Sequence, residues 1–395
     1  MSRIVVTGIG AISSLGYSVV ENRNSLVNSK CGLSALDNFK TNYSDLFKFG
    51  EIKIENNKLK NILNVNDESN TRTSLLAFHA LKEAIADSGL NFNEISSYDT
   101  ALIVGNTVGG MCLTDELYND ANSDTNGSPY LSSYDCGSVT LFLQKQYAIK
   151  GVCNTINTAC SSSANAIIFG ARLIKNGFAK RAIVGGVDSL AKFTINGFNS
   201  LGILAPQNCK PFDKDRNGLN LGEGAGFLVL EKESDAINKN HYAVLSGYCN
   251  ANDAFHASAL SENGEGPFLA MTEALKLANL FPQQIGYINC HGTGTENNDE
   301  VESKAMIRVF ENVPPFASTK SKTGHTLGAS AAIEAVFSIL ALYNQEIYPS
   351  LNFNTPIEST KLIPNLKYQK KSFEHVLTNS FGFGGNCSSL IFSKL

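Results

Sequence analysis

Residues 154–177 read NTINTACSSSANAIIFGARLIKNG, and this stretch predicts a strand, a short run of very small residues and a helix in succession. The run NTIN favours a short β-strand. Apolar side chains then recur at helical spacing at Ala164, Ile167, Ile168, Ala171 and Ile174. Gly177 is a natural C-terminal cap for that helix. Cys160 therefore lies just before a helix begins.

The same alternation of β-rich runs and helical periodicity extends over the chain. In the first half, strands are predicted at 3–8, 101–106, 154–157 and 181–186, and helices at 75–89 and 164–177. The second half shows the same alternation, with β-rich runs at 227–232, 243–248, 285–290 and 377–392 and helices at 266–280 and 331–344. This rhythm predicts an α/β fold with buried sheets, and a diverged duplication is compatible with it. Two polar segments, 31–72 and 112–135, are interpreted as surface excursions.

Composition and charge describe a well-packed globular protein and argue against several classes of function. Of the 395 residues, 43% are hydrophobic and 17% are charged. The net charge of −4 does not indicate binding to nucleic acid, because proteins bind its phosphates through clustered Lys and Arg. Nine widely spaced cysteines, without any Cys-x-x-Cys pair, argue against a disulfide framework and a clustered zinc site. Reduced thiols of this kind predict a cytoplasmic location.

The apolar runs of the chain do not predict a membrane role. The run before Thr7 spans three residues, which favours a first strand rather than the core of a signal peptide. The most apolar later run, residues 335–344, is well below the length of a bilayer span and directly follows Glu334. We therefore expect no membrane partner.

Cys160 is the first candidate for chemistry. A helix N-terminus presents unpaired N–H groups and the positive end of the helix dipole, which lowers the pKa of a nearby thiol. Its neighbours Ala159 and Ser161 to Ser163 are small and leave space for a substrate. A buried, inert thiol is the alternative interpretation, and it holds for most cysteines.

Two of the six histidines are placed to act with such a nucleophile. His291 follows a predicted strand in CHGTGT (290–295), and His325 lies in STKSKTGHTLGAS (318–330), a loop of small residues before a helix. Strand ends are where open α/β sheets build their sites, so Cys160 and these two histidines reinforce one another. Structural or surface roles are predicted for the other histidines, His79, His241, His256 and His375.

Three glycine-rich stretches, 8–16, 222–226 and 382–385, are compatible with phosphate loops when each is taken alone. None has the strand, spacing and lysine of a nucleotide-binding fingerprint. We interpret all three as turns.

Four motifs together resemble the β-ketoacyl-acyl-carrier-protein synthases: TACSSS (158–163), INCHGTGT (288–295), STKSKTGH (318–325) and NSFGFGGN (379–386). The resemblance covers essentially the whole chain. It implies a thiolase-like fold, a layered α-β-α-β-α core built from two related halves. Residues 1–235 would carry the nucleophilic cysteine and residues 236–395 both histidines. The Cys-His-His set is similar to that of the elongating, decarboxylating branch; thiolases use a second cysteine, and the initiating synthases have an asparagine in place of His325.

The resemblance implies a role for each member of that set. Cys160 would accept an acyl chain from the phosphopantetheine arm of a carrier protein. The backbone N–H groups of Cys160 and Phe383 would hold the thioester oxyanion. His291 and His325 would donate hydrogen bonds to the thioester carbonyl of malonyl-carrier protein as carbon dioxide leaves. The resulting carbanion would attack the acyl-cysteine and form a 3-oxoacyl product.

Further residues match supporting positions of the family. Lys320 is implied to support the histidines and to disfavour their cationic forms. Glu334 is implied to orient the second histidine from behind. Thr293 and Thr295 match threonines that bind the pantetheine arm, and Phe383 matches a gate between the acyl and malonyl steps.

The substrate and the pathway stay open at the level of the sequence. After HGTGT the chain continues ENNDE (296–300), which departs from the usual bacterial fatty-acid form. The spellings TACSSS and HGTGT lean toward polyketide-type ketosynthases, so a polyene or aryl-polyene pathway stands beside fatty-acid elongation. Val108 and Phe198 match positions of the acyl pocket.

The resemblance also implies the partners. An acidic carrier protein needs a local basic entrance, for which Lys210, Lys214, Arg216 and, more weakly, Arg72 are candidates. A homodimer is expected, or a heterodimer with a related ketosynthase subunit. No metal and no resident cofactor are expected, because the substrates arrive on phosphopantetheine.

Two other functions are alternatives to the condensing enzyme. One is a catalytically silent partner subunit, against which the retained cysteine argues. The other is a cysteine hydrolase or plain acyltransferase that uses Cys160 and one histidine, which leaves the second histidine motif without a reason.

Overall fold

The computed structural model describes residues 3–67, 69–123, 127–128 and 130–395. Within these residues ten strands form one sheet in the order β3-β2-β4-β5-β1-β6-β12-β11-β7-β8. The strands of the first half are β1 (Ile4–Ser13), β2 (Thr100–Gly105), β3 (Cys153–Ile156), β4 (Arg181–Asp188) and β5 (Gly224–Lys232). Those of the second half are β6 (Ala243–Asn252), β7 (Tyr287–Asn289), β8 (Phe316–Ala317), β11 (His375–Gly382) and β12 (Asn386–Ser393). A separate ladder joins β9 (Glu346–Ile347) to β10 (Gln369–Lys370).

The sheet consists of two half-sheets with the same pairing pattern. In the first, β2 lies parallel to β3 and β4, and β5 joins β4 to β1 through antiparallel pairs. In the second, β7 lies parallel to β8 and β11, and β12 joins β11 to β6 through antiparallel pairs. A short β1–β6 ladder connects the halves. The duplication that the sequence left open is therefore present in the topology.

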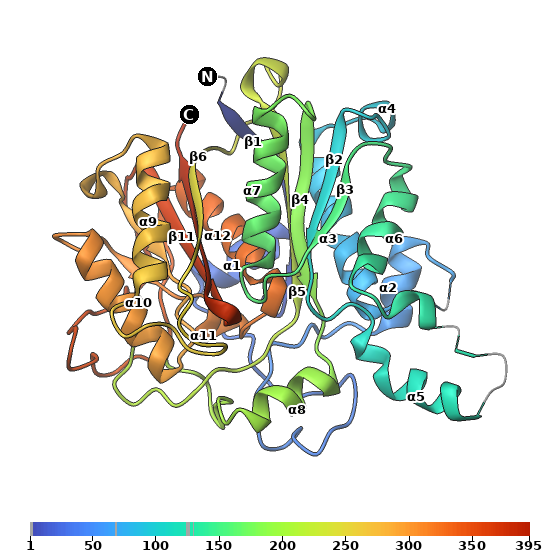
Figure 1. Ribbon diagram of the computed structural model, residues 1–395, viewed down its shortest axis with the longest axis horizontal. Coiled ribbons are helices and arrows are strands. Elements are labelled where there is room, and N and C mark those ends of the chain that lie inside the picture. The colour runs from blue at the N-terminus through green and yellow to red at the C-terminus, as the bar shows by residue number, and fades with distance from the viewer. Residues whose placement is uncertain (1–2, 68, 124–126, 129) are drawn as a thin grey trace.

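Helices form the remaining layers (Figure 1). Between the half-sheets, α7 (Ser162–Lys175) and α12 (Ser330–Asn344) contact each other and strands of both halves. Outside the first half-sheet lie α3 (Arg72–Ser88) and α6 (Gly137–Tyr147), and outside the second lie α9 (Glu265–Ala278) and α10 (Glu296–Val309). The connections carry α1 (Val19–Val27), α2 (Asn56–Leu63), α4 (Phe92–Ile95), α5 (Thr114–Ser123), α8 (Lys192–Ser200) and α11 (Lys320–Thr323). The expected α-β-α-β-α layering is confirmed.

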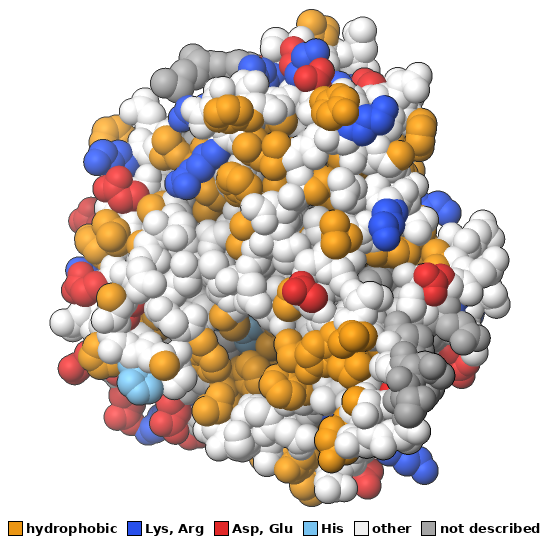
Figure 2. Space-filling model, turned by 45° about the vertical axis from the view of Figure 1, so that its right-hand side comes forward, with side chains coloured by type: hydrophobic (Ala, Val, Ile, Leu, Met, Phe, Trp, Pro, Cys, Tyr) orange, Lys and Arg blue, Asp and Glu red, His pale blue; other side chains and the backbone are white. Residues whose placement is uncertain are grey.

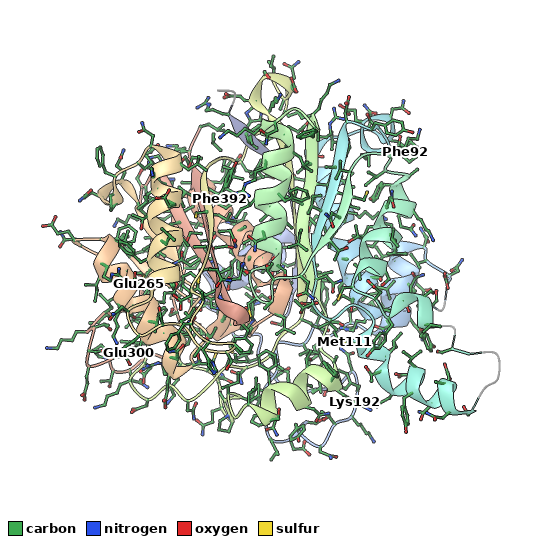
Figure 3. All side chains as sticks on the ribbon, viewed as in Figure 1. Phe92, Met111, Lys192, Glu265, Glu300 and Phe392 are labelled. Atoms are coloured by element: carbon green, nitrogen blue, oxygen red, sulfur yellow. The ribbon has the colours of Figure 1, made fainter. Side chains whose placement is uncertain are left out.

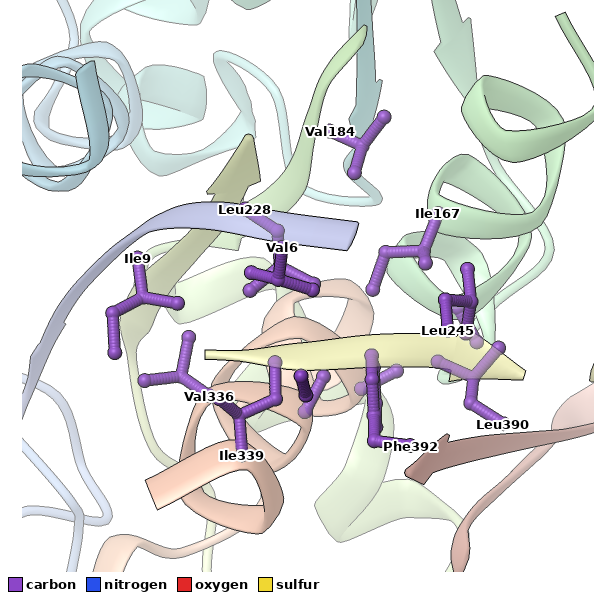
Figure 4. Close-up of a cluster of buried hydrophobic side chains, with 14 of the residues drawn as sticks. Val6, Ile9, Ile167, Val184, Leu228, Leu245, Val336, Ile339, Leu390 and Phe392 are labelled. Carbon is purple, nitrogen blue, oxygen red and sulfur yellow. The ribbon is translucent and has the colours of Figure 1, made fainter. Parts of the chain in front are cut away.

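The largest core cluster fills the space between the two half-sheets (Figure 4). Ile167 on α7 and Val336 on α12 meet strand residues such as Val6, Leu228 and Leu245 there, and all five are buried. Burying an aliphatic side chain of this size stabilises the fold by about 1.5–3 kcal/mol. The two central helices are thus fixed by apolar packing along their length, and their N-terminal ends carry the loops of the site.

The interpretation of the glycine-rich stretches as turns was wrong for parts of two of them. Residues 8–13 belong to β1, which runs to Ser13, and residues 224–226 begin β5. A Cβ on Gly8 would lie 2.3 Å from the carbonyl oxygen of Ala84, and one on Gly10 would lie 2.1 Å from that of Ala80. Both glycines allow α3 to approach the strand closely, a requirement that turn chemistry does not reveal.

The two polar segments differ in the structure. The interpretation of 31–72 as a surface excursion was wrong for its centre, where Phe49 and Ile52 are buried. In 112–135, α5 has no buried residue, which agrees with the prediction. Residues 124–126 and 129 of that segment lie outside the described residues.

One stretch, Leu327–Asn344, is long and apolar enough to cross a bilayer by composition. It ends with α12, and 89% of it is buried inside the fold, as in the core helix of a globular protein. It is therefore only weak support for a membrane span.

Candidate active site

Cys160 lies in a tight turn between β3 and α7, as the sequence predicted. Ala159 before it has a φ of +53°, a left-handed conformation that is strained for a residue with a side chain. Two hydrogen bonds of Ser162 hold the turn: its Oγ accepts from the Thr158 N–H at 2.9 Å and donates to the Ala159 carbonyl at 2.6 Å. The turn resembles the strained elbows that expose nucleophiles at strand ends.

Burial reverses the expected effect of the helix on the thiol. It raises the pKa of Cys160 to about 11, while the Lys320 ammonium and the backbone N–H groups of Phe383 and Cys160 act in the opposite direction. The expectation of a lowered thiol pKa was therefore wrong, because the desolvation of the thiolate outweighs the dipole at this depth. The same two N–H groups are those expected to hold an oxyanion.

Phe383 reaches Cys160 because β11 ends directly beside the nucleophile turn. A Cβ on Gly382 would lie 2.7 Å from the Thr158 carbonyl oxygen and 3.2 Å from the Cys160 nitrogen. Only glycine allows this approach, which brings the following N–H against the sulfur.

His325 is fixed by backbone and side-chain contacts. Its N–H donates to the Asn220 carbonyl at 2.7 Å, and its own carbonyl accepts from the Gly222 N–H at 2.9 Å. The ring Nδ1 accepts from the Leu327 N–H at 3.0 Å. A proton on Nδ1 would oppose that contact, so the neutral ring carries its proton on Nε2. His325 is therefore a hydrogen-bond donor on the side away from Leu327.

His291 is held at the end of β7 by a buried carboxylate. The Glu302 side chain on α10 accepts from the His291 N–H at 2.9 Å and from the Gly292 N–H at 2.8 Å. It also accepts from the Asn379 side chain on β11 at 3.1 Å. Three buried donors thus converge on one carboxylate and fix the histidine loop against two other elements.

The structure brings the three predicted residues together. One side-chain atom each from Cys160, His291 and His325 lie within 4.8 Å of one another, and all three residues are buried. The two imidazole rings meet edge to face, with centroids 5.3 Å apart. Burial, followed by the nearby Lys320 ammonium, lowers the pKa of both histidines well below the usual value. Both rings are therefore neutral at pH 7.

Lys320 and Glu334 form a buried ion pair next to the histidines. The Lys320 Nζ donates to Glu334 Oε1, and both side chains are almost fully buried. Burial raises the pKa of Glu334 to about 7, against the opposing effect of Lys320. Glu334 lies on α12, one turn after the loop that carries His325. The side chain of Glu334 thus contacts Lys320, and its implied role of orienting His325 stays a prediction.

A Cys-His-His set also suits a transition metal such as zinc. A ligating histidine donates its other ring N–H to an acceptor. The Nδ1 of His325 instead accepts from a backbone N–H. That contact fits a histidine that donates from Nε2 better than one that ligates through it.

A pocket of about 450 Å³ opens over the cluster. It is lined by Cys160, both histidines, Thr293, Thr295, Phe198 and Phe383 among others. The hydroxyls of Thr293 and Thr295 lie 2.9 Å apart, and the rings of Phe198 and Phe383 stack at 5.9 Å. Figure 2 shows a hollow with a histidine side chain at its floor and a largely hydrophobic border. The pocket suits an extended, mostly apolar substrate arm with a few polar groups.

Val108 lies in a separate place. It is fully buried and belongs to a cluster with Ile195 and Leu327, against which Phe198 also packs. It does not line the pocket over Cys160. The cluster lies behind Phe198, and Phe198 in turn stacks on Phe383, the residue expected to gate the site.

Two of the four predicted entrance cations were wrong. Arg72 is 7% exposed and pairs with Glu223 inside the fold. Arg216, also 7% exposed, donates to backbone carbonyls and lies 3.7 Å from Glu300, which Figure 3 labels on α10. Neither guanidinium is free to meet a carrier protein.

The other two cations remain near the surface. Lys214 is exposed and pairs with Glu358. The backbone nitrogen of Lys210 lies close to Gly294 in the HGTGT loop, where a Cβ on that glycine would be 3.4 Å away. These two lysines are the part of the predicted basic entrance that the structure leaves available.

Sequence reasoning missed the carboxylates that hold the site. Glu302 holds the His291 loop, and Asp299 accepts from the N–H groups of Gly294 and Phe212. The available signal was the spacing of these two acids, three residues apart on one face of a helix that follows HGTGT. Without the fold, that spacing equally describes a solvated helix face.

Comparison with known proteins agrees with this geometry. The family model described as "Beta-ketoacyl synthase, N-terminal domain" matches residues 1–236, and "Beta-ketoacyl synthase, C-terminal domain" matches residues 242–354. The chain belongs to the β-ketoacyl synthase family.

Relatives of this β-ketoacyl synthase match over its whole length. A "3-oxoacyl-[acyl-carrier-protein] synthase 2" of Vibrio cholerae is 31% identical over 415 residues, covering 100% of this chain and 99% of the relative. A "3-oxoacyl-[acyl-carrier-protein] synthase, mitochondrial" of Arabidopsis thaliana is also 31% identical, covering 100% of this chain and 93% of that protein. Both names describe synthases that act on acyl groups held by a carrier protein.

Solved structures give the same result for the fold. "The ishigamide ketosynthase/chain length factor" matches with a TM-score of 0.93 and 28% identity, over 100% of this chain and 99% of that one. "Ketosynthase (ApeO) in Complex with its Chain Length Factor (ApeC) from Xenorhabdus doucetiae" matches with a TM-score of 0.86 and 32% identity, over 100% and 98%. The thiolase-like fold of the β-ketoacyl synthases is therefore the fold of this chain.

Proposed function

We propose that the protein catalyses the decarboxylating condensation of an acyl group, held on Cys160, with malonyl-acyl-carrier protein to give a 3-oxoacyl-carrier protein. The observation that carries this proposal is the convergence of one thiol and two neutral imidazoles within 4.8 Å in the lining of one pocket. A hydrolase needs one base beside its nucleophile. Two neutral imidazoles beside a thiol instead suit the stabilisation of an enolate.

In the first step the Cys160 sulfur attacks the thioester carbonyl of an acyl-carrier protein. The N–H groups of Cys160 and Phe383, which already point at the sulfur, hold the oxyanion of the tetrahedral intermediate. The carbon–sulfur bond to the carrier breaks, and the proton of the Cys160 thiol is transferred to the departing pantetheine sulfur. Burial raises the pKa of the free Cys160 thiol to about 11, so the thiol is mostly protonated at pH 7 before an acyl donor binds.

In the second step malonyl-carrier protein occupies the pocket. The bond between its carboxylate and methylene carbon breaks, and the electron pair moves into an enolate whose oxygen accepts from the two imidazoles. The enolate carbon then attacks the acyl-cysteine. The carbon–sulfur bond to Cys160 breaks, a proton restores the thiol, and a 3-oxoacyl-carrier protein leaves with carbon dioxide. Neutral histidines suit this step because they donate hydrogen bonds without protonating the carbanion.

We further propose the setting in which this reaction takes place. The partner is an acyl carrier protein, and the substrate is a fatty-acyl or a polyene-type chain. A homodimer is the simplest assembly, but two of the similar structures contain a ketosynthase with a chain length factor, which supports a heterodimer as the alternative. The nine cysteines are free, as in a cytoplasmic protein. The steps above use no resident cofactor, and residues 1–235 and 236–395 act as the two halves.

The test is the intact mass of the protein after incubation with a panel of saturated, unsaturated and aryl acyl-carrier proteins, followed by malonyl-carrier protein and detection of carbon dioxide. We expect one acyl group on Cys160, then carbon dioxide and a 3-oxoacyl product. Acylation followed by hydrolysis, without carbon dioxide, would support the hydrolase or acyltransferase. Absence of acylation across the panel, with and without a co-expressed ketosynthase partner, would support the silent subunit.

A further inference from the structure

A buried carboxylate outside the predicted machinery lies between the two sides of the site. Asp188 is the last residue of β4 and has no exposed surface. Its Oδ1 accepts from the Thr107 N–H at 2.9 Å and the Val108 N–H at 2.8 Å. Its Oδ2 accepts from the Thr107 hydroxyl at 2.5 Å and the Gly328 N–H at 2.7 Å. Donors from two distant loops, after β2 and after His325, therefore share one side chain.

The first of these loops forms the wall behind Phe198. Thr107 and Val108 directly follow β2, and Val108 is buried in the cluster that contains Ile195 and Leu327. Two N–H groups and one hydroxyl of this loop end on Asp188, which fixes how far the Val108 side chain extends into the cluster. Through Phe198, which packs on the same cluster, this wall is connected to Phe383.

The second loop sets the proton position of His325. Gly328 donates to Asp188, and its neighbour Leu327 donates to the His325 Nδ1 at 3.0 Å. Leu327 has a φ of +51°, a conformation that a non-glycine residue keeps only when its surroundings enforce it. Asp188 accepts from the N–H of the peptide that follows Leu327. In addition, the side chains of Val108 and Leu327 belong to the same buried cluster. The contact that makes Nε2 the donor thus depends on a residue of the other half of the chain.

We propose that Asp188 is a positioning residue that fixes the Val108 wall and the His325 ring in one arrangement, so that acyl-chain selection and malonyl decarboxylation share a single support. The proposal rests on the proposed function, because it assigns Asp188 a role in each of its two half-reactions. The side chain acts through backbone N–H groups and the Thr107 hydroxyl, and it does not line the pocket over Cys160.

Asp188→Asn is the informative substitution because it retains the shape and removes one acceptor. If the amide oxygen takes the place of Oδ1, the N–H contacts of Thr107 and Val108 stay, and the NH₂ group faces the Gly328 N–H and the Thr107 hydroxyl, which can turn to accept from it. The opposite orientation loses two backbone contacts instead of one, so the first is favoured. We expect decarboxylation of malonyl-carrier protein to fall about tenfold or more, as for a buried N–H left without an acceptor, with acylation of Cys160 nearly unchanged.

Asp188→Ala removes the acceptors of both loops, the one after β2 and the one after His325. It should lower decarboxylation at least as much as Asp188→Asn and, in addition, alter the ranking of acyl-chain lengths that acylate Cys160. Thr107→Val removes only a hydroxyl contact on the wall side. It should alter the chain-length ranking and leave decarboxylation within about twofold.

Glu231→Gln is the matched control. Glu231 is a buried carboxylate on the neighbouring strand β5, at the end where β4 begins, and it accepts from Thr7 and Lys239. The variant should lose stability without separating the two half-reactions. A readout that does not need activity is the ¹⁵N spectrum of labelled histidine, in which Asp188→Asn should shift the Nδ1 and Nε2 resonances of His325 and Glu231→Gln should not.

The outcomes separate this proposal from the function on which it rests. If the wild type neither acylates nor decarboxylates, the proposed function fails, and the histidine spectrum alone decides the role of Asp188. Suppose that the wild type performs both half-reactions, and that Asp188→Asn and Glu231→Gln have the same effects on the two rates and on the His325 resonances. Asp188 is then merely a structural residue, and the proposal is overturned.

Discussion

The two halves of the chain have the same strand order but carry different chemistry at equivalent strand ends. The loop after β3, before α7, carries Cys160, and the equivalent loop after β8, before α12, carries Lys320 and His325. The loop after β2 carries Val108, where the loop after β7 carries His291. Both sets of parallel strands end at the site, as is usual in α/β sheets. The topology determines where these loops lie, and the residues in each loop determine its chemistry.

The halves also hold their functional groups in different ways. Cys160 is presented by backbone geometry, through a left-handed Ala159 and the close approach of Gly382. His291 is instead held by the buried carboxylate of Glu302, and the buried Lys320–Glu334 ion pair lies beside both histidines. The nucleophile side should therefore be sensitive to changes of size and the histidine side to changes of charge. The following predictions test that difference.

The largest effect is expected for Cys160→Ala. Acylation and condensation should fall by at least about 10³-fold, because no other side chain in the cluster forms a stable thioester. Decarboxylation of malonyl-carrier protein should persist, because both imidazoles stay in place. Intact mass and carbon dioxide release measure the two reactions. Cys290→Ala, a buried cysteine adjacent to His291 in sequence, is the control and should still acylate. Joint loss of both activities in Cys160→Ala would contradict the separation of the halves.

His325→Ala should give the converse result. Loss of one enolate donor is expected to slow decarboxylation by about 10²–10³-fold, as for a missing oxyanion-hole donor. Acylation of Cys160 should stay within about tenfold, since its oxyanion is held by backbone N–H groups. Single-turnover acylation and carbon dioxide release give the two rates. The control is His375→Ala, a histidine on β11 whose Nδ1 meets the Ser393 hydroxyl.

The alkylation of Cys160 should report its burial. With a pKa of about 11, the thiolate fraction rises with pH across the whole accessible range. The rate of inactivation by iodoacetamide should therefore rise about tenfold per pH unit between pH 7 and pH 10, without a plateau. A plateau near neutral pH would mean that the helix dipole outweighs burial after all.

Glu302→Gln tests the charged support of the second half. Its NH₂ group would oppose a backbone N–H of His291 or Gly292, so we expect a loss of about 1–3 kcal/mol in the free energy of unfolding at pH 7. Burial raises the pKa of Glu302 in the folded state from 4.5 to about 7. The folded wild type therefore takes up a proton as the pH falls through 7, which stabilises it relative to a variant that cannot.

The stability gap between wild type and Glu302→Gln should accordingly widen from pH 7 towards pH 5, as measured by urea unfolding. Glu265→Gln, at an exposed position on α9 that Figure 3 labels, is the control and should show no such trend. A gap that narrows on acidification would show that Glu302 is ionised throughout in the folded protein.

The smallest effect is expected at the surface lysine. Lys214 forms an exposed ion pair with Glu358, so Lys214→Ala should leave the melting temperature almost unchanged and change the KM for carrier protein by about twofold at most. Arg216→Ala, two residues away, should instead destabilise the fold, because its buried guanidinium donates to the carbonyls of Asp213 and Glu296. Melting curves distinguish the two. A large change of KM for Lys214→Ala at unchanged stability would instead support Lys214 as part of a basic entrance for the carrier protein.

Sequence alone located most of the elements and the three side chains that converge in the cluster, Cys160, His291 and His325. The strand, turn and helix around Cys160 agree with the structure, and the predicted helix at 75–89 corresponds to α3 at Arg72–Ser88. These features are local, because helical spacing, caps and small-residue turns are set by residues within a few positions of one another. The same holds for the motifs, each a contiguous run at a strand end.

Tertiary structure decided what depends on contacts between distant segments. The raised pKa of Cys160 follows from burial by other elements, which outweighs the helix dipole that the local sequence provides. Arg72 and Arg216 changed from entrance cations to buried anchors because Glu223 and the HGTGT loop lie beside them in the fold. Asp188 joins loops that are 80 and 140 residues away along the chain. The sequence thus determined which groups are available, and the packing of the two halves determined their ionisation and what they hold in place, because desolvation and hydrogen-bond partners are properties of the folded interior.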